Sequence, residues 1–270
     1  MKIPENRFKK ALLSGQQQYG YWLGLCNPIS AELCGHVGFD WLLIDAEHAP
    51  NDLSTIQHQL LAINNTASQA VVRIVEGRTA LIKQVLDIGA QTILVPMVET
   101  AEQARQLVEA VHYPPKGSRG VGTAIARAAR WNQVENYLSD ADEQICLLIQ
   151  IESVTALDNL AEILEVEGVH GVFVGPADLA GSMGFLGKPS HPEVIAKVEA
   201  AIQAIANSDK SAGILATDPN LARRYETQGA QFLALGVDTL TLASGAAKIL
   251  ATHRNDADAS EKSTEGSGAY

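Results

Sequence analysis

Eight short apolar runs, rich in valine, isoleucine and leucine, recur along the chain. Apolar runs without strict polar alternation are typical of strands buried on both faces of a parallel sheet. They lie at Tyr19–Leu25, Trp41–Ile44, Ala70–Val75, Thr92–Val98, Ile145–Ile151, Gly171–Val174, Ala212–Ala216 and Phe232–Val237.

Segments with helical spacing separate these runs. In the first of them, Leu81, Val85 and Ile88 are predicted to form one apolar stripe. Gly89 and Gly229 stand where the C-caps of two of the helices are expected. The predicted helices are Ala80–Ile88, Ala101–Val111, Ala156–Leu164, Pro192–Ala206 and Leu221–Gly229.

Alternation of strand and helix over residues 1–254 predicts an α/β fold, a single (β/α)8 TIM barrel with a closed parallel sheet. An open doubly wound sheet is the alternative, but the GxGxxG turn expected after its first strand is missing. Two long connections, Tyr113–Gln144 and Gly175–Pro192, are candidates for functional loops. Residues 255–270 are small and polar and are predicted to form a mobile tail.

Charge and composition narrow the class of protein. The 20 Lys and Arg against 31 Asp and Glu give a net charge of −11, which argues against nucleic acid and anionic membranes as partners. No run approaches the ~20 apolar residues of a membrane span, and the N-terminus does not resemble a signal peptide. Three cysteines without a CxxC pair (Cys26, Cys34, Cys146) favour a reducing, cytoplasmic setting.

In a barrel of this kind the active site lies at the carboxyl ends of the strands. Charged and amide side chains gather there on two pairs of neighbouring strands. Strand two ends in Asp45, Glu47 and His48, and strand three carries Arg73. Strands five and six supply Gln150, Glu152, Ala177 and Asp178.

Glu152 and Asp178 are expected to converge, because neighbouring strands are only ~4.8 Å apart. Two such carboxylates favour a hard divalent cation; the alternative is that one of them pairs with Arg73 or caps a helix. His48 is a candidate general base or a structural histidine. Arg73 either stabilises a developing negative charge or forms a buried salt bridge to Asp45 or Glu47.

Several other chemistries lack their residues. No GxxxxGK[ST], HExxH or GxSxG motif is present, and no lysine lies on a predicted strand, which disfavours a Schiff-base aldolase. The glycines of GSRGVG are only a weak indication of a phosphate cradle. Asp87, taken alone, is interpreted as solvated helix surface.

Several segments in order resemble the HpcH/HpaI family of metal-dependent pyruvate aldolases. They are FDWLLIDAEHAP, LVPMV, YPPKGSRGVG, ARAARWN, QIES, VEGVHGVFVGPADL and LGVDT, within a similarity that runs from about Phe8 to Lys248. The resemblance implies a lyase that uses Mg²⁺, Mn²⁺ or Co²⁺, with Zn²⁺ as an alternative. It also implies a homohexamer, a dimer of trimers, whose last helix packs on a neighbouring subunit.

The resemblance further implies roles for single residues. His48 would accept a proton, helped by Asp87 of a neighbouring subunit, and Arg73 would stabilise an enolate. Glu152 and Asp178 would bind the metal, and Gln150 and the backbone of Ala177 the oxo acid. The aldehyde pocket would be lined by Trp22, Leu215 and Val121. Ala46 stands where the family commonly has glycine, beside the expected base.

The expected reaction is reversible cleavage of a 4-hydroxy-2-oxo acid to pyruvate and an aldehyde. The resemblance favours 4-hydroxy-2-oxoheptane-1,7-dioate, which gives succinic semialdehyde in aromatic catabolism. The alternative substrate is 2-keto-3-deoxy-L-rhamnonate, which gives lactaldehyde, and it is suggested by VEGRTALIKQVLDIGAQT and AEQARQLVEA. A different class, an inactive ligand-binding barrel, is disfavoured by the intact set of His48, Arg73, Glu152 and Asp178.

Overall fold

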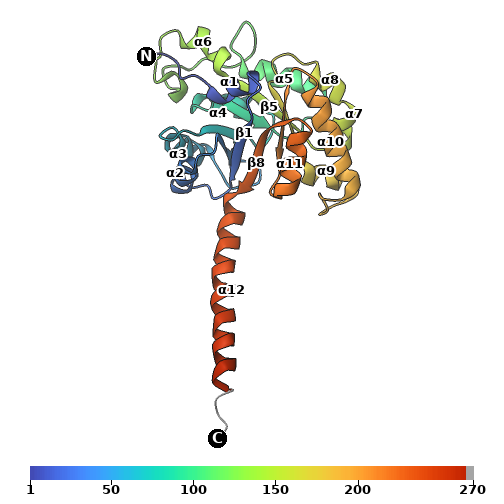
Figure 1. Cartoon of the computed structure of the whole chain (residues 1–270). Coiled ribbons are helices and arrows are strands. Elements are labelled where there is room, and N and C mark those ends of the chain that lie inside the picture. The colour runs from blue at the N-terminus through green and yellow to red at the C-terminus, as the bar shows by residue number, and fades with distance from the viewer. Residues whose placement is uncertain (266–270) are drawn as a thin grey trace.

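The computed structural model describes the backbone of residues 1–265 and the side chains of residues 1–254. Eight parallel strands close into a barrel in the order β1 to β8, and helices surround it (Figure 1). The predicted TIM barrel is confirmed. The strands are β1 Gln18–Leu23, β2 Trp41–Asp45, β3 Gln69–Arg73, β4 Thr92–Val95, β5 Cys146–Ile151, β6 Gly171–Val174, β7 Ser211–Leu215 and β8 Ala230–Val237.

Each strand is followed by at least one helix, and a short helix precedes the barrel. The helices are α1 Arg7–Leu13, α2 Pro28–Val37, α3 Leu53–Ile63, α4 Thr79–Asp87, α5 Ala101–Val111, α6 Tyr137–Gln144, α7 Val154–Asp158, α8 Leu160–Leu164, α9 Pro176–Ser182, α10 Pro192–Ala206, α11 Pro219–Thr227 and α12 Asp238–Glu265, with a 3-10 turn at Arg127–Ala129.

Two predicted helical details are wrong. The segment Ala156–Leu164 belongs to two short helices, α7 and α8, which meet at Asn159. On α4 the buried residues are Ile82, Val85 and Leu86. The buried face is therefore displaced by about one residue from the predicted stripe. The predicted positions Gly89 and Gly229 do follow α4 and α11, each with a φ of +105° that suits glycine.

The core has two layers, as the near-continuous apolar runs predict. Between strands and helices lies a large aliphatic cluster, and inside the barrel lies a smaller, partly aromatic one. Phe8 and Leu12 of α1 close the amino-terminal end of the barrel, where the Phe8 ring packs against Trp41 and Phe232. Filling the interior from this end leaves the carboxyl ends of the strands free to form a site.

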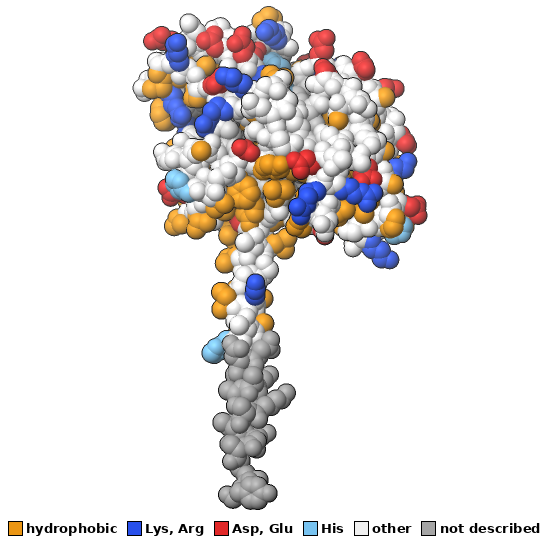
Figure 2. Space-filling view, in the orientation of Figure 1, with side chains coloured by type: hydrophobic (Ala, Val, Ile, Leu, Met, Phe, Trp, Pro, Cys, Tyr) orange, Lys and Arg blue, Asp and Glu red, His pale blue; other side chains and the backbone are white. Residues whose placement is uncertain are grey.

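The last helix, α12, departs from the barrel at the carboxyl end of β8 and projects away from the body (Figure 1). Apolar side chains on it, including Leu240, Leu242 and Ile249, are exposed, and so are Ile29 and Leu33 of α2. Figure 2 shows apolar side chains gathered on the body where α12 leaves it. Within the described residues, no helix combines the length and apolar character needed to cross a membrane.

The predicted polar tail, 255–270, cannot be compared side chain by side chain. The helix α12 includes residues 255–265, whereas 266–270 and all side chains from Asn255 onward lie outside the described residues. The predicted domain boundary at 254 therefore stays a prediction.

Candidate active site

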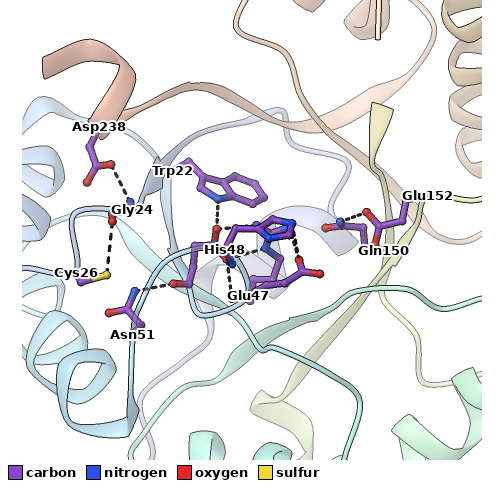
Figure 3. Close-up of polar contacts among 11 residues, drawn as sticks. Trp22, Gly24, Cys26, Glu47, His48, Asn51, Gln150, Glu152 and Asp238 are labelled. Atoms are coloured by element: carbon purple, nitrogen blue, oxygen red, sulfur yellow. Dashed lines mark hydrogen bonds and ion pairs between the residues drawn. The ribbon is translucent and has the colours of Figure 1, made fainter. Parts of the chain in front are cut away.

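A cavity of about 390 Å³ opens at the carboxyl ends of the strands, where the sequence places the site. It brings together residues from β1, β2, β3, β5, β6, β7 and β8 and from the start of α9. Its lining includes seven of the predicted site residues, Trp22, His48, Arg73, Gln150, Ala177, Asp178 and Leu215. Figure 3 shows Glu47 and His48 on one side of this region and Gln150 with Glu152 on the other.

Arg73 is the buried cation of the site. Its position on β3 is in register with Asp45 on β2, so the two side chains meet across neighbouring strands. Arg73 Nε and Nη2 donate to the two Asp45 oxygens at 2.9 and 2.6 Å, and Nη1 lies 2.6 Å from Glu47 Oε2. The sequence left open a salt bridge to Asp45 or Glu47, and the structure contains both.

These contacts set the ionisation of the two carboxyl groups. Burial alone would raise the pKa of Asp45, but the hydrogen bonds and charge of Arg73 outweigh it and hold that pKa below its usual value. For Glu47 burial dominates, and its pKa is raised despite the nearby Arg73. Two of the five guanidinium N–H groups donate to Asp45, and Nη1 is in ion-pair contact with Glu47, so Arg73 retains donors for a ligand.

Trp22 forms the apolar wall beside this network. Its indole N–H donates to Asp45 Oδ2 at 3.2 Å, and the Arg73 guanidinium lies 4.9 Å from the centre of the Trp22 ring. Such cation–π contact keeps the guanidinium over the cavity. Leu215, Val237 and Phe173 complete an apolar side of the cavity. The family resemblance implies Trp22 and Leu215 as walls of an aldehyde pocket, and that role stays a prediction.

His48 lies at the rim, in the loop after β2. Its side chain is 66% exposed, and Nε2 lies 3.8 Å from Glu47 Oε2. The turn is held by Asp45, whose Oδ1 accepts from the backbone N–H of Glu47 at 3.0 Å. Asn51 adds a 2.6 Å hydrogen bond to the Asp45 carbonyl oxygen. The imidazole is therefore accessible to a bound substrate.

Glu152 lies just behind the cavity wall, only 3% exposed. Its Oε1 accepts from the backbone N–H of Met97 at 2.9 Å, and its Oε2 accepts from Gln150 Nε2 at 2.5 Å. Burial raises the pKa of Glu152, and the negative charges of Asp178 and Glu47 raise it further. A Cβ on Gly175 would lie 2.6 Å from Glu152 Oε2, so glycine there leaves room for the carboxylate.

The donor set fits a hard divalent cation. Glu152 and Asp178 supply carboxylate oxygens, and the buried Gln150 Oε1 has no hydrogen-bond partner among the described residues. Asp178 is exposed in the first turn of α9, beside Ala177. No cluster of three or more His, Cys, Asp or Glu residues suited to a metal occurs within residues 1–254, so a cation would need ligands beyond this pair.

Besides Glu152, which lies behind the wall, two predicted site residues lie far from this cavity within one chain. Asp87 stands at the end of α4, where its Oδ1 lies 3.1 Å from Arg119 Nη2. Val121 is 63% exposed in the connection between α5 and α6. Both segments lead into the amino-terminal ends of strands, β4 and β5, and so lie at the end of the barrel opposite the cavity. In a (β/α)8 barrel each strand runs toward the carboxyl end and the following helix runs back. The segment after a helix therefore lies at the amino-terminal end of the barrel.

Two residues that support the site were not predicted. Asp238, at the start of α12, accepts from the backbone N–H groups of Gly24 and Leu25 at 2.8 and 3.1 Å and so ties the β1 loop to β8 (Figure 3). Met97 has a φ of +56°, and its N–H is directed at Glu152. Asp238 was visible as a charged residue at a strand end, whereas no local pattern indicates the role of Met97.

The comparisons with known proteins agree with this geometry. Residues 18–245 match the family model described as HpcH/HpaI aldolase/citrate lyase. The chain is 58% identical over 242 residues to a hydroxypyruvate/pyruvate aldolase from Pseudomonas aeruginosa, covering 90% of each. It is 52% identical over 259 residues to a 2-keto-3-deoxy-L-rhamnonate aldolase from Klebsiella pneumoniae, covering 96% of this chain and 97% of the relative.

Solved structures place it in the same group. A HpcH/HpaI aldolase/citrate lyase family protein from Burkholderia cenocepacia is 36% identical, with a TM-score of 0.89 and coverage of 92% of this chain and 99% of that one. The chain therefore belongs to the HpcH/HpaI aldolase/citrate lyase family. It is an aldolase, a carbon–carbon lyase built on a TIM barrel.

Proposed function

We propose that this enzyme is a class II, divalent-metal-dependent pyruvate aldolase, which cleaves a 4-hydroxy-2-oxo acid to pyruvate and an aldehyde and also runs in reverse. The observation that carries the proposal is the single cavity in which Arg73, His48, Gln150 and Asp178 meet, with Glu152 directly behind its wall. The aldolases that are 52 and 58% identical to this chain over nearly its whole length support the same class.

In this proposal Glu152 and Asp178 hold the cation. Their oxygens suit Mg²⁺, Mn²⁺ or Co²⁺, with Zn²⁺ as an alternative, and the remaining ligands would be water and substrate. When bound, such a cation acts as a Lewis acid that polarises the 2-oxo group and stabilises negative charge on its oxygen. The raised pKa of Glu152 indicates a carboxylate that gains from a nearby positive charge.

The side chains of this chain perform the remaining tasks. Gln150 and the backbone N–H of Ala177 orient the oxo acid in the cavity. His48, or a water molecule that it activates, accepts the proton of the 4-hydroxyl group as the C3–C4 bond breaks. The bonding electrons pass to the pyruvate fragment as an enolate, whose charge the free donors of Arg73 stabilise. Return of a proton to C3 gives pyruvate.

The aldehyde partner is proposed to be small and uncharged at its far end. The cavity wall beside Trp22 and Leu215 is apolar, and Arg73, the one Lys or Arg among the described lining residues, already pairs with Asp45 and Glu47. A distal carboxylate, as in the heptanedioate, would find no free cation there within one chain. Lactaldehyde from 2-keto-3-deoxy-L-rhamnonate meets this condition, and so does the aldehyde of a hydroxypyruvate aldol.

A second copy of the chain is proposed to complete the site. Asp87 can assist His48, and Val121 can line the aldehyde pocket, only from another subunit, because both lie at the opposite end of their own barrel. The exposed apolar residues of α12 and α2 support an assembly in which the last helix is exchanged, and the proposed state is a hexamer built as a dimer of trimers.

A substrate panel tests the proposal. Metal-stripped enzyme would be assayed with and without added Mn²⁺ on 2-keto-3-deoxy-L-rhamnonate, on the 4-hydroxy-2-oxoheptanedioate of aromatic catabolism, and on hydroxypyruvate aldols. Cleavage that depends on the cation and is fastest with uncharged aldehyde portions is expected. Fastest cleavage of the heptanedioate would contradict the assigned aldehyde class, and no cleavage of any member would favour the inactive ligand-binding barrel.

A further inference from the structure

A second cavity, of about 350 Å³, lies at the amino-terminal end of the barrel, opposite the proposed active site. It is enclosed by the N-terminal segment, the end of α3, the starts of β3 and β4, and the Arg127–Ala129 turn. Side chains that line it include Asn6, Arg7, Asn64, Arg127, Arg130 and Gln144. The proposed aldolase reaction uses none of them.

Arg127 is the buried cation of this cavity, with a residue exposure of only 6%. Its Nη1 donates to the Ile88 carbonyl at 2.8 Å, and with the Asn64 amide turned to the orientation that satisfies both of its atoms, Nη2 donates to the Asn64 side-chain oxygen at 2.8 Å. A Cβ on Gly89 would lie 2.4 Å from Nη1, so the glycine lets the guanidinium reach the backbone. Both partners are neutral, and no Asp or Glu within residues 1–254 forms an ion pair with Arg127.

The charge balance around the cavity is also positive. Arg7 and Arg130 line it with Arg127, and among the described residues neither forms an ion pair with a carboxylate. The single acidic lining residue, Glu5, lies 2.7 Å from Lys10, which neutralises it. Three arginines thus line one polar hollow in a protein whose net charge is −11; Arg127 is buried, whereas Arg7 is exposed and its Nη2 donates to the Ala67 carbonyl at 3.1 Å.

Burying a positive charge in this way lowers the stability of the fold unless a bound negative charge compensates it. A buried charge with only neutral hydrogen-bond partners loses hydration without gaining an opposite charge. Burial lowers the pKa of Arg127, and the neighbouring Arg130 lowers it further, which reflects that cost. Guanidinium groups match the oxygen geometry of phosphate, and a dianion would compensate two of the three charges.

We propose that the amino-terminal cavity is an anion site, which binds a small molecule through a dianionic phosphate group held by Arg127, Arg130 and Arg7. The cavity lies at the opposite end of its own barrel from the substrate cavity, and anion binding there does not depend on the proposed reaction. Because the cavity touches the ends of β3 and β4 that are distant from Arg73, bound anion is expected to stabilise the barrel without occupying the substrate cavity.

Calorimetric titration of the full chain with inorganic phosphate tests the proposal, with acetate at matched ionic strength as the comparison. Saturable phosphate binding, at least ten times tighter than acetate, is expected. At ten times the phosphate Kd, the Tm should rise by roughly 3 °C. Arg127→Gln should weaken phosphate binding about tenfold or more, and Arg130→Gln, at the less buried position, about threefold or more.

Two control variants test whether phosphate binds at this cavity and not elsewhere on the protein. Arg105→Gln removes an exposed arginine on α5 that pairs with Glu102, and it should leave phosphate binding unchanged. Arg73→Gln should also leave it unchanged, because a phosphate held at the substrate cavity would instead lose affinity there. Folding of each variant would be checked by circular dichroism, and Arg130→Gln keeps the test decisive if Arg127→Gln does not fold.

Three outcomes would overturn the proposal. They are the absence of saturable binding, equal affinity for acetate and phosphate, and binding that survives Arg130→Gln but is lost in Arg73→Gln. In the first case, a change of oligomeric state in Arg130→Gln would identify the cavity as an interface between subunits.

Discussion

At the scale of single residues, the site depends on how Arg73 divides its donors. Two N–H groups donate to Asp45, and Nη1 forms an ion pair with Glu47, which fixes the guanidinium plane over Trp22 and leaves donors free. A point charge would lack this fork. The geometry therefore links a structural salt bridge and a proposed catalytic role in one side chain.

Replacing Arg73 by lysine tests that link. Arg73→Lys keeps the charge but cannot engage Asp45, Glu47 and an enolate together, so kcat should fall about 10²–10³-fold while KM changes far less. Steady-state kinetics with circular dichroism would measure this. Arg78→Lys, at an exposed arginine that pairs with Glu76 in the next loop, is the matched control. An unchanged kcat would return Arg73 to a purely structural role.

Gly175 offers a second test at this scale. The added methyl group of Gly175→Ala would lie 2.6 Å from Glu152 Oε2 and displace that carboxylate, so affinity for Mn²⁺ should fall at least about tenfold. Gly181→Ala, in α9, would place its Cβ at an ordinary 3.4 Å from Leu186 and serves as the control. Manganese titration followed by paramagnetic resonance is the measurement. Equal affinity in both variants would argue against Glu152 as a ligand.

At the scale of elements, His170 connects β5 and β6 at the amino-terminal end of the barrel. Its backbone N–H donates to the Leu147 carbonyl at 2.9 Å, and its Nδ1 accepts from the Leu147 N–H at 3.2 Å. Burial, helped by the nearby Lys9, His112 and Lys210, lowers its pKa from 6.5 to about 4. The folded state therefore keeps this imidazole neutral.

The lowered pKa predicts a dependence of stability on pH. The unfolded chain binds a proton at His170 below about pH 6.5, whereas the folded chain resists it down to about pH 4, so this stabilisation is present above 6.5 and is lost between those values. His170→Asn should flatten that part of the curve, and His36→Asn, on exposed α2, should not. Urea unfolding from pH 7 to 4 would measure both. A parallel curve for His170→Asn would refute the assignment.

The sequence predicted the elements well where one local pattern decides them. Val-, Ile- and Leu-rich runs located all eight strands to within three residues at either end, because burial on both faces of the sheet leaves few polar positions. The stripe on α4 was displaced, since Leu81 and Ile82 are equally apolar and only packing selects between them. The roles of Met97 and Arg127 were not predicted, because each depends on contacts between distant segments.

At the scale of the whole molecule, one barrel does not contain every predicted site residue. The predicted positions of His48, Arg73, Gln150 and Asp178 follow from strand ends, that of Trp22 from the resemblance to the family, and all five line one cavity. Asp87 and Val121 lie at the other end, which sequence patterns within one chain cannot connect to the cavity. In the proposed hexamer, a neighbouring subunit supplies both residues to the cavity.

Mixing experiments test this assembly directly. His48→Ala and Asp87→Ala should each lose most activity, and joint refolding should restore part of it, because some mixed interfaces would combine an intact His48 with an intact Asp87. Refolding of each variant alone is the control. If the mixture stays as inactive as its components, Asp87 does not act across subunits.

Truncation tests which part of the C-terminal region holds the assembly. Deletion of 255–270 should leave the hexamer intact, because that segment carries almost no apolar surface. Ending the chain before Leu240 should dissociate the hexamer, because it removes the exposed apolar residues of α12. Light scattering would report both. An intact hexamer after the longer deletion would remove α12 from the proposed interface.

The central claim is that the cavity generates a pyruvate enolate with the help of a bound divalent cation. Exchange of the methyl protons of pyruvate with deuterated solvent measures that step without any aldehyde. Metal-stripped enzyme should exchange only at the background rate, and added Mn²⁺ should restore exchange in the parent but not in Glu152→Ala or Asp178→Ala. Full exchange in excess chelator, or restored exchange in both variants, would contradict the account.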